Sequence, residues 1–456
     1  MQRIFNDSLE LIGSTPMLKV NKINTGKCNL YLKLESYNLG GSIKDRPAKN
    51  MILAAEKKGL LKKGGTIVEA TAGNTGIALA IIALKKGYNV IIVVPDKMTI
   101  EKIFHLRALG AEVIVARSDV INGHPEYYLN IAQTIAKKKK AFYINQFSNK
   151  DNLKSHVKEL APEIYGQLKG KVDAFIAGVG TGGTISGVGK FLKRKNKNCE
   201  LVLADPKGSI LKDLIKKNII NENVGSWIVE GIGEDFCPPL LDKNLIDDAY
   251  AISDLEAIKT CNQLLKKEGI LAGSSSGTLI AAAIKYCKAQ TVRKNVVTLV
   301  CDAGDKYLRK IYNENWRIKN NFFINKKENN LADLVSYKHN SGIMPSIELN
   351  SSCALAFKLM QENGLNFILV TDKKQKIKGI INEKCLLNGV LKKSFEEKVK
   401  YFITKIRKIE YDTKIDKVIN IMRKEDHLFV YKEKKFIGIL NKEDILNYIK
   451  FNKNYA

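Results

Sequence analysis

The 456-residue sequence lacks several patterns that would assign it to common protein classes. Its eight cysteines include no Cys-x-x-Cys pair, so the sequence indicates neither a zinc site nor a disulfide framework. No apolar run is long enough to span a bilayer, and Met1–Phe5 is not followed by the apolar core of a signal peptide. We therefore expect a soluble protein of a reducing compartment, the cytoplasm, with no membrane association and no bound metal.

Acidic residues are scarce relative to basic ones: 47 Asp and Glu stand against 75 Lys and Arg, which gives a formal net charge of +28. Such an excess commonly indicates an anionic partner such as nucleic acid. Here, however, the lysines are scattered, and the densest run covers only residues 137–140. No basic stripe carries interleaved aromatic residues. We therefore expect no specific nucleic-acid partner.

The length predicts more than one domain. Up to residue 317, apolar strands alternate with helices, which predicts an α/β domain with mostly parallel sheets and helices on both faces. Residues 318–330 are rich in Lys and Asn and predict a linker. Two similar blocks follow, 331–390 and 391–456, each with a helix, two strands and a short final helix. The sequence therefore predicts a tandem repeat in a separate part of the chain.

One lysine stands on a constrained turn, Gly40-Gly41-Ser42-Ile43-Lys44-Asp45-Arg46. The two glycines allow a sharp turn close to a ligand, and Pro47 suits the first turn of a helix. A lysine that is desolvated at such a junction can lose its proton near neutral pH and attack an aldehyde to form a Schiff base. On this heptapeptide alone, an ordinary surface lysine is the simpler interpretation.

A glycine-rich loop, Gly180-Thr181-Gly182-Gly183-Thr184, lies between a predicted strand and a predicted helix. Its backbone N–H groups and the positive end of the helix dipole are expected to point at a phosphate. Gly178, Gly180 and Gly183 also satisfy G-x-G-x-x-G, and Asp205 follows at a distance that suits a ribose. From the residues alone, a phosphate monoester, a dinucleotide and a structural turn all stay open.

A second helix N-terminus follows the loop Thr71-Ala72-Gly73-Asn74-Thr75-Gly76 and suits a carboxylate. The Asn74 amide could donate to a phenolic oxygen, and Gln146 is a further amide donor, although a turn-forming helix cap is the alternative for each. Combined with Lys44 and the phosphate loop, these groups predict an aldehyde cofactor that carries a phosphate and acts on an amino acid. Pyridoxal phosphate, an electron sink for carbanions, fits that description.

Seven motifs in order make the sequence similar to the fold-type II pyridoxal-phosphate enzymes, in the branch of cystathionine β-synthase and cysteine synthase. They are Ser42–Arg46, Thr71–Gly76, Pro95–Met98, Leu106–Glu112, Gly180–Thr184, Glu230–Gly233 and Gly273–Gly277. The resemblance covers residues 5–317 and displaces the dinucleotide interpretation. It implies a tryptophan synthase β-like fold of two α/β subdomains with twisted, mostly parallel sheets. The repeats resemble the paired CBS domains that such synthases often append, and the family implies a homodimer.

The resemblance also implies roles for individual residues. Lys44 would form the Schiff base and move the α-proton, and Asn74 would contact the cofactor's O3′ oxygen. The phosphate would be held by Gly180, Thr181, Gly182, Gly183 and Thr184. The substrate carboxylate would be received by Thr71, Ala72, Asn74, Thr75 and Gln146.

The implied reaction is a β-replacement in the biosynthesis of cysteine. L-Serine would lose its hydroxyl to give an aminoacrylate, and L-homocysteine would add to form L-cystathionine. Gly231–Phe236 resembles the bacterial cystathionine β-synthases in particular. Cysteine synthesis from O-acetylserine and sulfide is the alternative, because Phe147 stands where animal cystathionine β-synthases have tyrosine and cysteine synthases have phenylalanine.

Other departures from the family pattern bear on cofactor retention. Ala303 replaces the serine that faces the pyridine nitrogen, and a buried nitrogen without its donor costs about 1–3 kcal/mol unless water substitutes. Glu159-Leu160-Ala161 replaces Thr-Thr-Gly before Pro162. A catalytically weakened protein kept for binding or regulation is therefore a further hypothesis. Since no extension with the Cys and His haem ligands of animal enzymes precedes the catalytic region, we expect no haem.

The CBS repeats also depart from their pattern. Cys385 replaces the aspartate that normally holds the ribose of an adenosyl ligand in the first repeat. Asp444 remains in the second repeat, but Asn441 stands in place of the threonine. We therefore favour a role in dimerisation and packing over binding of an adenosyl ligand such as S-adenosylmethionine.

Overall fold

Contacts between residues divide the chain into two units, Met1–Leu308 and Arg309–Ala456. The computed structural model describes residues 4–71, 73–96, 98, 100–117, 120, 124–220, 224–313, 316–317, 320, 322, 331, 334–335, 337–338, 345–363, 365–392, 395–442 and 444–446. The predicted linker, 318–330, lies outside these residues except for Asn320 and Phe322. No helix in these segments is both long and apolar enough to cross a membrane.

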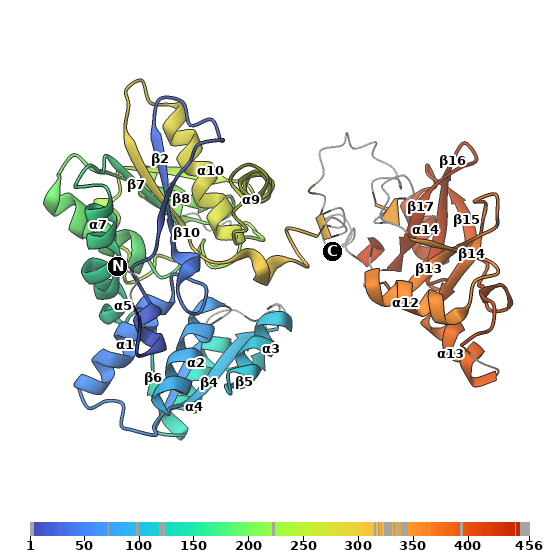
Figure 1. The fold of residues 1–456 in the computed structure, drawn as a ribbon, viewed down its shortest axis with the longest axis horizontal. Helices are drawn as coiled ribbons and strands as arrows, with labels where there is room; N and C mark the ends of the chain where they lie inside the picture. The colour runs from blue at the N-terminus through green and yellow to red at the C-terminus, as the bar shows by residue number, and fades with distance from the viewer. Residues whose placement is uncertain are drawn as a thin grey trace. The chain divides into compact units, whose positions relative to one another are not determined.

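The first unit contains two sheets, which confirms the predicted α/β architecture of two subdomains (Figure 1). The larger sheet has the strand order β1-β2-β10-β7-β8-β9, and only β1 runs antiparallel to its neighbour. Its strands are β1 (Met17–Lys19), β2 (Asn29–Leu34), β7 (Ala174–Ala177), β8 (Glu200–Pro206), β9 (Asp248–Ile252) and β10 (Asn295–Val300). The helices of this subdomain are α5 (Lys150–Ser155), α6 (Ala161–Gln167), α7 (Gly183–Lys195), α8 (Leu211–Lys217), α9 (Asp254–Glu268) and α10 (Ser274–Lys288).

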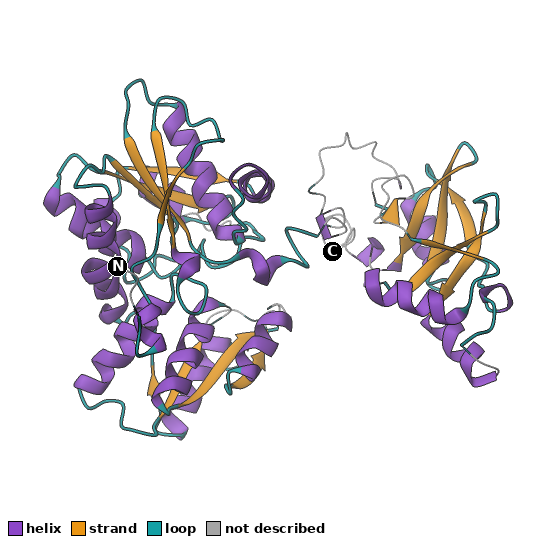
Figure 2. Ribbon diagram, viewed as in Figure 1, coloured by secondary structure: helices purple, strands orange, loops and turns teal. Residues whose placement is uncertain are grey.

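The smaller sheet is entirely parallel, with the order β5-β4-β3-β6. Its strands are β3 (Thr66–Ala70), β4 (Asn89–Pro95), β5 (Glu112–Ala116) and β6 (Phe142–Tyr143), and its helices are α1 (Asp45–Lys57), α2 (Asn74–Lys86), α3 (Ile100–Ala108) and α4 (Tyr128–Lys138). Alternate residues of β3 enter different hydrophobic clusters: Ile67 packs with residues of α1 and α2, and Val68 packs with residues of α4. Because successive side chains of a strand point to opposite faces, helices cover both faces of the sheet, as Figure 2 shows.

The second unit contains two small sheets of similar construction. One has the order β12-β13-β14 and the other β11-β17-β16-β15. In each, a parallel pair (β12 with β13, β15 with β16) is followed by an antiparallel hairpin (β13 with β14, β16 with β17). The repeated topology agrees with the tandem repeat that the sequence predicts. The strands are β11 (Tyr337–Lys338), β12 (Ser346–Glu348), β13 (Phe367–Thr371), β14 (Ile377–Asn382), β15 (Arg407–Glu410), β16 (His427–Lys432) and β17 (Lys435–Asn441).

The helices of the second unit are α12 (Cys353–Asn363), α13 (Glu383–Lys392) and α14 (Ile415–Met422). One hydrophobic cluster joins the two repeats, because Phe367 and Ile380 of the first pack with Phe429 and Ile439 of the second. Short helical turns complete the two units: Ser8–Leu11, Glu35–Tyr37, His156–Leu160, Lys243–Leu245, Gly304–Tyr307 and Val399–Tyr401.

Candidate active site

Lys44 lies where the two subdomains of the first unit meet. Its loop leads into α1 of the smaller subdomain, and the backbone of the same loop binds the end of β10 in the larger sheet. Ile43 N donates to Cys301 O at 2.8 Å, and Ala303 N donates to Gly41 O at 3.1 Å. Gly41 has φ +71°, a left-handed conformation that favours glycine. The turn predicted from the sequence is therefore real, and long-range hydrogen bonds fix it.

The surroundings of Lys44 favour the neutral amine. Burial lowers the pKa of Lys44 below its ordinary value of 10.5, although Cys301, Asp302 and Glu234 act in the opposite direction. The side chain borders a pocket whose other lining residues come from both the glycine-rich loop and apolar strands and helices. They include Gly180, Thr181, Gly182, Thr184, Ile232, Leu279 and Leu299. A neutral lysine beside such a pocket is a competent nucleophile.

The glycine-rich loop, residues 180–184, connects β7 to α7 and lines this pocket. A Cβ added to Gly180 would lie 2.7 Å from Gly231 O, and one added to Gly183 would lie 2.6 Å from Asn152 Oδ1. Gly182 has φ +81°, and its added Cβ would meet Leu241 N at 2.7 Å. At Gly180 and Gly182 the clash is with backbone atoms, so only glycine fits there, and at Gly183 a side chain would displace Asn152. The loop therefore holds its N–H groups at the N-terminus of α7 with little side chain in between.

Two buried polar side chains hold the threonines of the glycine-rich loop. Asn152 Nδ2 donates to Thr181 Oγ1 at 3.1 Å and to Gln146 O at 2.9 Å. His156 Nε2 lies 3.3 Å from Thr184 Oγ1. Burial lowers the pKa of His156 to about 3, and Lys44 and Arg46 add to the effect, so this imidazole is neutral. Neither Asn152 nor His156 belongs to a motif, so the sequence alone does not single them out.

The predicted carboxylate loop brings together four of its five expected residues; Ala72 lies outside the described residues. Thr71 and Asn74 stand at the N-terminal end of α2, where Gly73 N donates to Thr71 Oγ1 at 3.2 Å. Thr75 Oγ1 donates to Gln146 Oε1 at 2.7 Å, so the predicted amide donor from another segment does reach this loop. The arrangement gives a helix N-terminus with hydroxyl and amide groups around it, which suits a carboxylate.

A network of polar groups follows β10 and binds Asn74. Asp302 Oδ2 accepts from Asn74 Nδ2 at 2.8 Å and from Tyr307 OH at 2.7 Å. Lys306 Nζ donates to Asn74 Oδ1 at 3.0 Å and to Gly40 O at 3.1 Å. Ala303 lies between these groups in sequence, and its methyl side chain donates no hydrogen bond. The other carboxylate oxygen, Asp302 Oδ1, is buried and has no hydrogen-bond partner among the residues that the structure describes.

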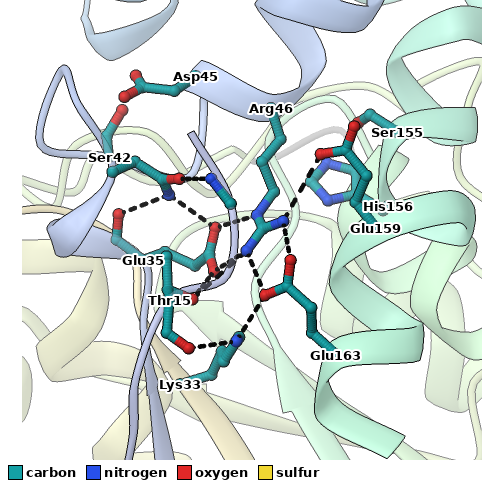
Figure 3. Close-up of polar contacts among 12 residues, drawn as sticks. Thr15, Lys33, Glu35, Ser42, Asp45, Arg46, Ser155, His156, Glu159 and Glu163 are labelled. Atoms are coloured by element: carbon teal, nitrogen blue, oxygen red, sulfur yellow. Dashed lines mark hydrogen bonds and ion pairs between the residues drawn. The ribbon is translucent and has the colours of Figure 1, made fainter. Parts of the chain in front are cut away.

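A cluster of buried charges anchors the Lys44 loop from the side of Arg46 (Figure 3). The Arg46 guanidinium binds both oxygens of Glu35 at 2.7 and 3.0 Å and both oxygens of Glu163 at 2.7 and 2.8 Å. Lys33 Nζ binds Glu163 at 2.7 Å and Thr15 O at 2.7 Å. Glu159, one of the departures from the family pattern, lies 3.6 Å from the same guanidinium. The two bidentate pairs join α1 to the turn at Glu35 and to α6, and Lys33 adds β2 to the cluster.

Glu163 is the ionised partner of both cations. Its burial would raise its pKa, but the hydrogen bonds and charges of Arg46 and Lys33 outweigh burial and lower the pKa to about 2. By contrast, burial raises the pKa of Glu159 above its ordinary value, although the charges of Arg46 and Lys49 act in the opposite direction. The cluster therefore stabilises the ionised form of Glu163 more strongly than that of Glu159.

A second buried cation stands beside the carboxylate loop. Lys102 is 2% exposed and forms an ion pair with Glu230. Its Nζ lies 4.9 Å from the centre of the Tyr307 ring and 3.9 Å from the position of a Cβ on Gly73. Glu230 lies within one of the family motifs, but Lys102 does not stand out in the sequence, because a lysine in a helix normally faces solvent.

In the second unit, the residues at the adenosyl-binding positions make local contacts. Asn441 N donates to Asp444 Oδ2 at 2.8 Å, and Asp444 N donates to Asn441 Oδ1 at 2.9 Å. In the first repeat, Cys385 N donates to Asn382 Oδ1 at 2.9 Å, and Cys385 Sγ lies 3.1 Å from Thr404 Oγ1. Asp444 and Cys385 thus both contribute to the packing of their repeats. Within the described segments, no cluster of three or more His, Cys, Asp or Glu residues could hold a metal.

Comparison with known proteins agrees with this geometry. Residues 9–302 match the model of a family described as pyridoxal-phosphate dependent enzyme, and residues 399–451 match the CBS domain. The cystathionine beta-synthase of Apis mellifera is 36% identical, with 99% of this chain and 92% of the relative covered. Cysteine synthase A of Escherichia coli is 38% identical over 68% of this chain and 95% of the relative.

Among solved structures, a hydrogen sulfide-producing enzyme from Fusobacterium nucleatum superposes with a TM-score of 0.62 and 39% identity. The superposition covers 67% of this chain and 100% of that enzyme. The expected fold class is confirmed. The chain belongs to the pyridoxal-phosphate dependent enzymes, in the branch of the cystathionine β-synthases and cysteine synthases, and it carries a C-terminal CBS domain.

Proposed function

We propose that the protein is a lyase that uses pyridoxal phosphate to condense L-serine with L-homocysteine into L-cystathionine. The observation that carries this proposal is the position of Lys44, a half-buried amine. It lines a pocket with the phosphate-binding type of loop at 180–184, and Lys306 joins the Lys44 loop to Asn74 of the carboxylate-binding type of loop at 71–76. Similarity to the honeybee cystathionine beta-synthase along 99% of this chain supports the choice of substrates.

The residues present fit pyridoxal phosphate. Burial keeps the Lys44 amine ready to bind an aldehyde, and the three glycines of residues 180–184 leave the N-terminus of α7 open to a phosphate. Thr181 and Thr184 would add hydroxyl donors, and Asn74 would contact the phenolic oxygen. When bound, the cofactor supplies an electron sink for a carbanion at the substrate's α-carbon.

The side chains of the site would bind and orient the substrate and move its proton. Lys44 Nζ would hold the cofactor and then remove the α-proton of serine. Thr71, Ala72, Asn74, Thr75 and Gln146 would orient the serine carboxylate. Leu279, Leu299 and Ile232 line the pocket with apolar surface, which excludes water from a reactive centre. The neutral His156 and the amide of Asn152 would act as positioning residues, because they fix the two threonines.

Ala303 gives this site a weaker hold on the cofactor than the family's serine would. Its methyl group offers no donor, so water would have to meet the pyridine nitrogen. The neighbouring network of Asp302, Asn74 and Lys306 keeps the loop in place without that donor. We therefore propose an active enzyme that releases its cofactor more readily than relatives with serine at this position.

Cysteine synthesis from O-acetylserine and sulfide is the second candidate. Phe147 directly follows Gln146, and its ring lies 5.6 Å from that of Phe236. This aromatic pair makes the neighbourhood of the substrate loop more apolar than a tyrosine would. Similarity to the cysteine synthase of Escherichia coli is also high, but it covers only 68% of this chain.

We also propose a cytoplasmic homodimer without haem, on the basis of the family and of the cysteine and motif patterns in the sequence. The catalytic domain would span residues 1–317, followed by the linker 318–330 and CBS domains at 331–390 and 391–456. The role that we propose for the CBS pair is packing and dimerisation, rather than binding of an adenosyl ligand. The contacts of Asp444 with Asn441 and of Cys385 with Thr404 support the part in packing.

The test supplies each donor–acceptor pair to purified holoenzyme and identifies the product by mass spectrometry. Cystathionine from serine and homocysteine is the expected result. Turnover with O-acetylserine and sulfide alone would instead establish the second candidate. An absorbance spectrum that serine leaves unchanged, together with no turnover, would show a binding or regulatory protein.

A further inference from the structure

Lys306 is a buried lysine to which the proposed chemistry assigns no part of its own. It lies in the short helical turn Gly304–Tyr307 that follows β10, and only 9% of its surface is exposed. Its Nζ donates to Asn74 Oδ1 at 3.0 Å, to Gly40 O at 3.1 Å and to Gly41 O at 3.5 Å. An ammonium group has three N–H donors, so these contacts use all of them. The lysine therefore joins the glycine turn to the N-terminal end of α2.

Carboxylates around Lys306 favour its charged form. Burial lowers the pKa of this amine below its ordinary value of 10.5, but the charges of Asp302, Asp305 and Asp45 act in the opposite direction. An ammonium group donates hydrogen bonds and accepts none. It can therefore face a side-chain amide only through the oxygen of that amide.

The hydrogen bonds of Asn74 fix the orientation of its amide. Asn74 Oδ1 accepts from Lys306, and Asn74 Nδ2 donates to Asp302 Oδ2 at 2.8 Å. Tyr307 OH donates to the same carboxylate oxygen at 2.7 Å, which holds that oxygen in place. The reversed amide would put Nδ2 beside an ammonium and Oδ1 beside a carboxylate, so it is disfavoured. Among the described residues nothing accepts the second Nδ2 hydrogen, and this hydrogen remains available for a ligand.

We propose that Lys306 is a positioning residue for the cofactor, because it orients the Asn74 amide to donate to the phenolic oxygen of pyridoxal phosphate. Without Lys306 the amide would be free to rotate, and its oxygen would then face an oxygen of the cofactor. This contact carries more of the cofactor's binding free energy here than in relatives with serine at position 303, since Ala303 offers no donor to the pyridine nitrogen. The inference rests on the proposed use of pyridoxal phosphate and adds a residue that acts through Asn74.

The test measures how tightly the full chain, freed of cofactor by dialysis against hydroxylamine, binds two aldehydes. One is pyridoxal phosphate, and the other is 3-deoxypyridoxal phosphate, which lacks the phenolic oxygen. Fluorescence titration gives the Kd of each aldehyde for the wild type, Lys306→Met, Asn74→Ala and the double variant. Lys49→Met is the matched control, since Lys49 Nζ also donates to a backbone oxygen, Leu9 O at 3.0 Å, but does not line the pocket.

Lys306→Met should weaken the binding of pyridoxal phosphate by roughly tenfold, which corresponds to the loss of one hydrogen bond. Its Kd for 3-deoxypyridoxal phosphate should stay close to that of the wild type. Each ratio compares a variant with the wild type for the same aldehyde, so the intrinsic difference between the two aldehydes cancels. Because Lys306 acts through Asn74, the double variant should bind pyridoxal phosphate no more weakly than Asn74→Ala alone. Lys49→Met should bind both aldehydes as the wild type does.

Equal weakening of both aldehydes by Lys306→Met, no weakening at all, or effects of Lys306 and Asn74 that simply add would overturn the assignment. A crystal structure of the wild-type holoenzyme is a second measurement that needs no variant: Asn74 Nδ2 should lie within about 3.2 Å of the phenolic oxygen while Lys306 still binds Oδ1. A holoenzyme in which Lys306 points away from Asn74 would also contradict the assignment. Failure of the proposed function looks different: the loaded enzyme would make no cystathionine, while the titrations, which use no substrate, would still decide the role of Lys306.

Discussion

Replacing Glu163 by glutamine keeps the shape of the side chain but removes a charge that Arg46 and Lys33 each bind at 2.7 Å. The folded protein lowers the pKa of Glu163 from 4.5 to about 2, even though burial alone would raise it. A difference of about 2.5 units at about 1.36 kcal/mol per unit corresponds to roughly 3 kcal/mol of stability. Because the folded-state pKa is the lower one, this stabilisation is present above about pH 4.5 and is lost as the pH falls toward 2.

The assay is urea unfolding of the full chain at pH 7 and pH 3. The chain has two tryptophans, so Trp316→Phe as background leaves Trp227 as the single fluorescent reporter of the first unit. Glu163→Gln should lower the free energy of unfolding by about 3 kcal/mol at pH 7 and by less than half of that at pH 3. Glu126→Gln, which breaks an exposed ion pair, should cost about 0.5 kcal/mol or less. A loss that is equal at both pH values, or no larger than that of the control, would refute the role of the buried cluster.

Three further substitutions test the proposed site. Lys44→Ala should abolish product formation but still allow the phosphate loop to bind the cofactor, as measured by fluorescence titration; appreciable turnover would contradict the assignment. Ala303→Ser should slow the release of the cofactor during dialysis, and an unchanged release rate would mean that the departure is harmless. Gly182→Ala should weaken cofactor binding by about tenfold or more, because φ is +81° and the new Cβ would lie 2.7 Å from Leu241 N. Normal binding in that variant would show that the loop can adopt another shape.

The sequence was sufficient for the architecture and for the loops of the site, because both depend on local patterns. Glycines next to a strand and a helix predict a phosphate loop, and alternation of strands and helices predicts parallel sheets. Helix boundaries were less accurate: a helix was expected to follow the loop Thr71–Gly76, but α2 begins within that loop, at Asn74. The residues Gly73–Gly76 resemble a turn, yet the side chains of Asn74 and Thr75 bind Asp302 and Gln146, which allows the backbone to continue as a helix.

The supporting charges could not be predicted, because their partners are distant in the sequence. Arg46 and Glu163 are 117 residues apart, and Lys102 and Glu230 are 128 apart. A lone charged residue in a helix is normally interpreted as part of a solvated face, and only the folded chain shows that Arg46 and Lys102 are buried.

The central claim is that Lys44 carries the cofactor. Reduction of the holoenzyme with borohydride, followed by tryptic digestion and mass spectrometry, tests it most directly. The account predicts the mass of the reduced pyridoxyl phosphate group on the peptide that contains Lys44, and its absence there in Lys44→Ala. Labelling of a different lysine, or of none in a protein that retains bound cofactor, would contradict the account.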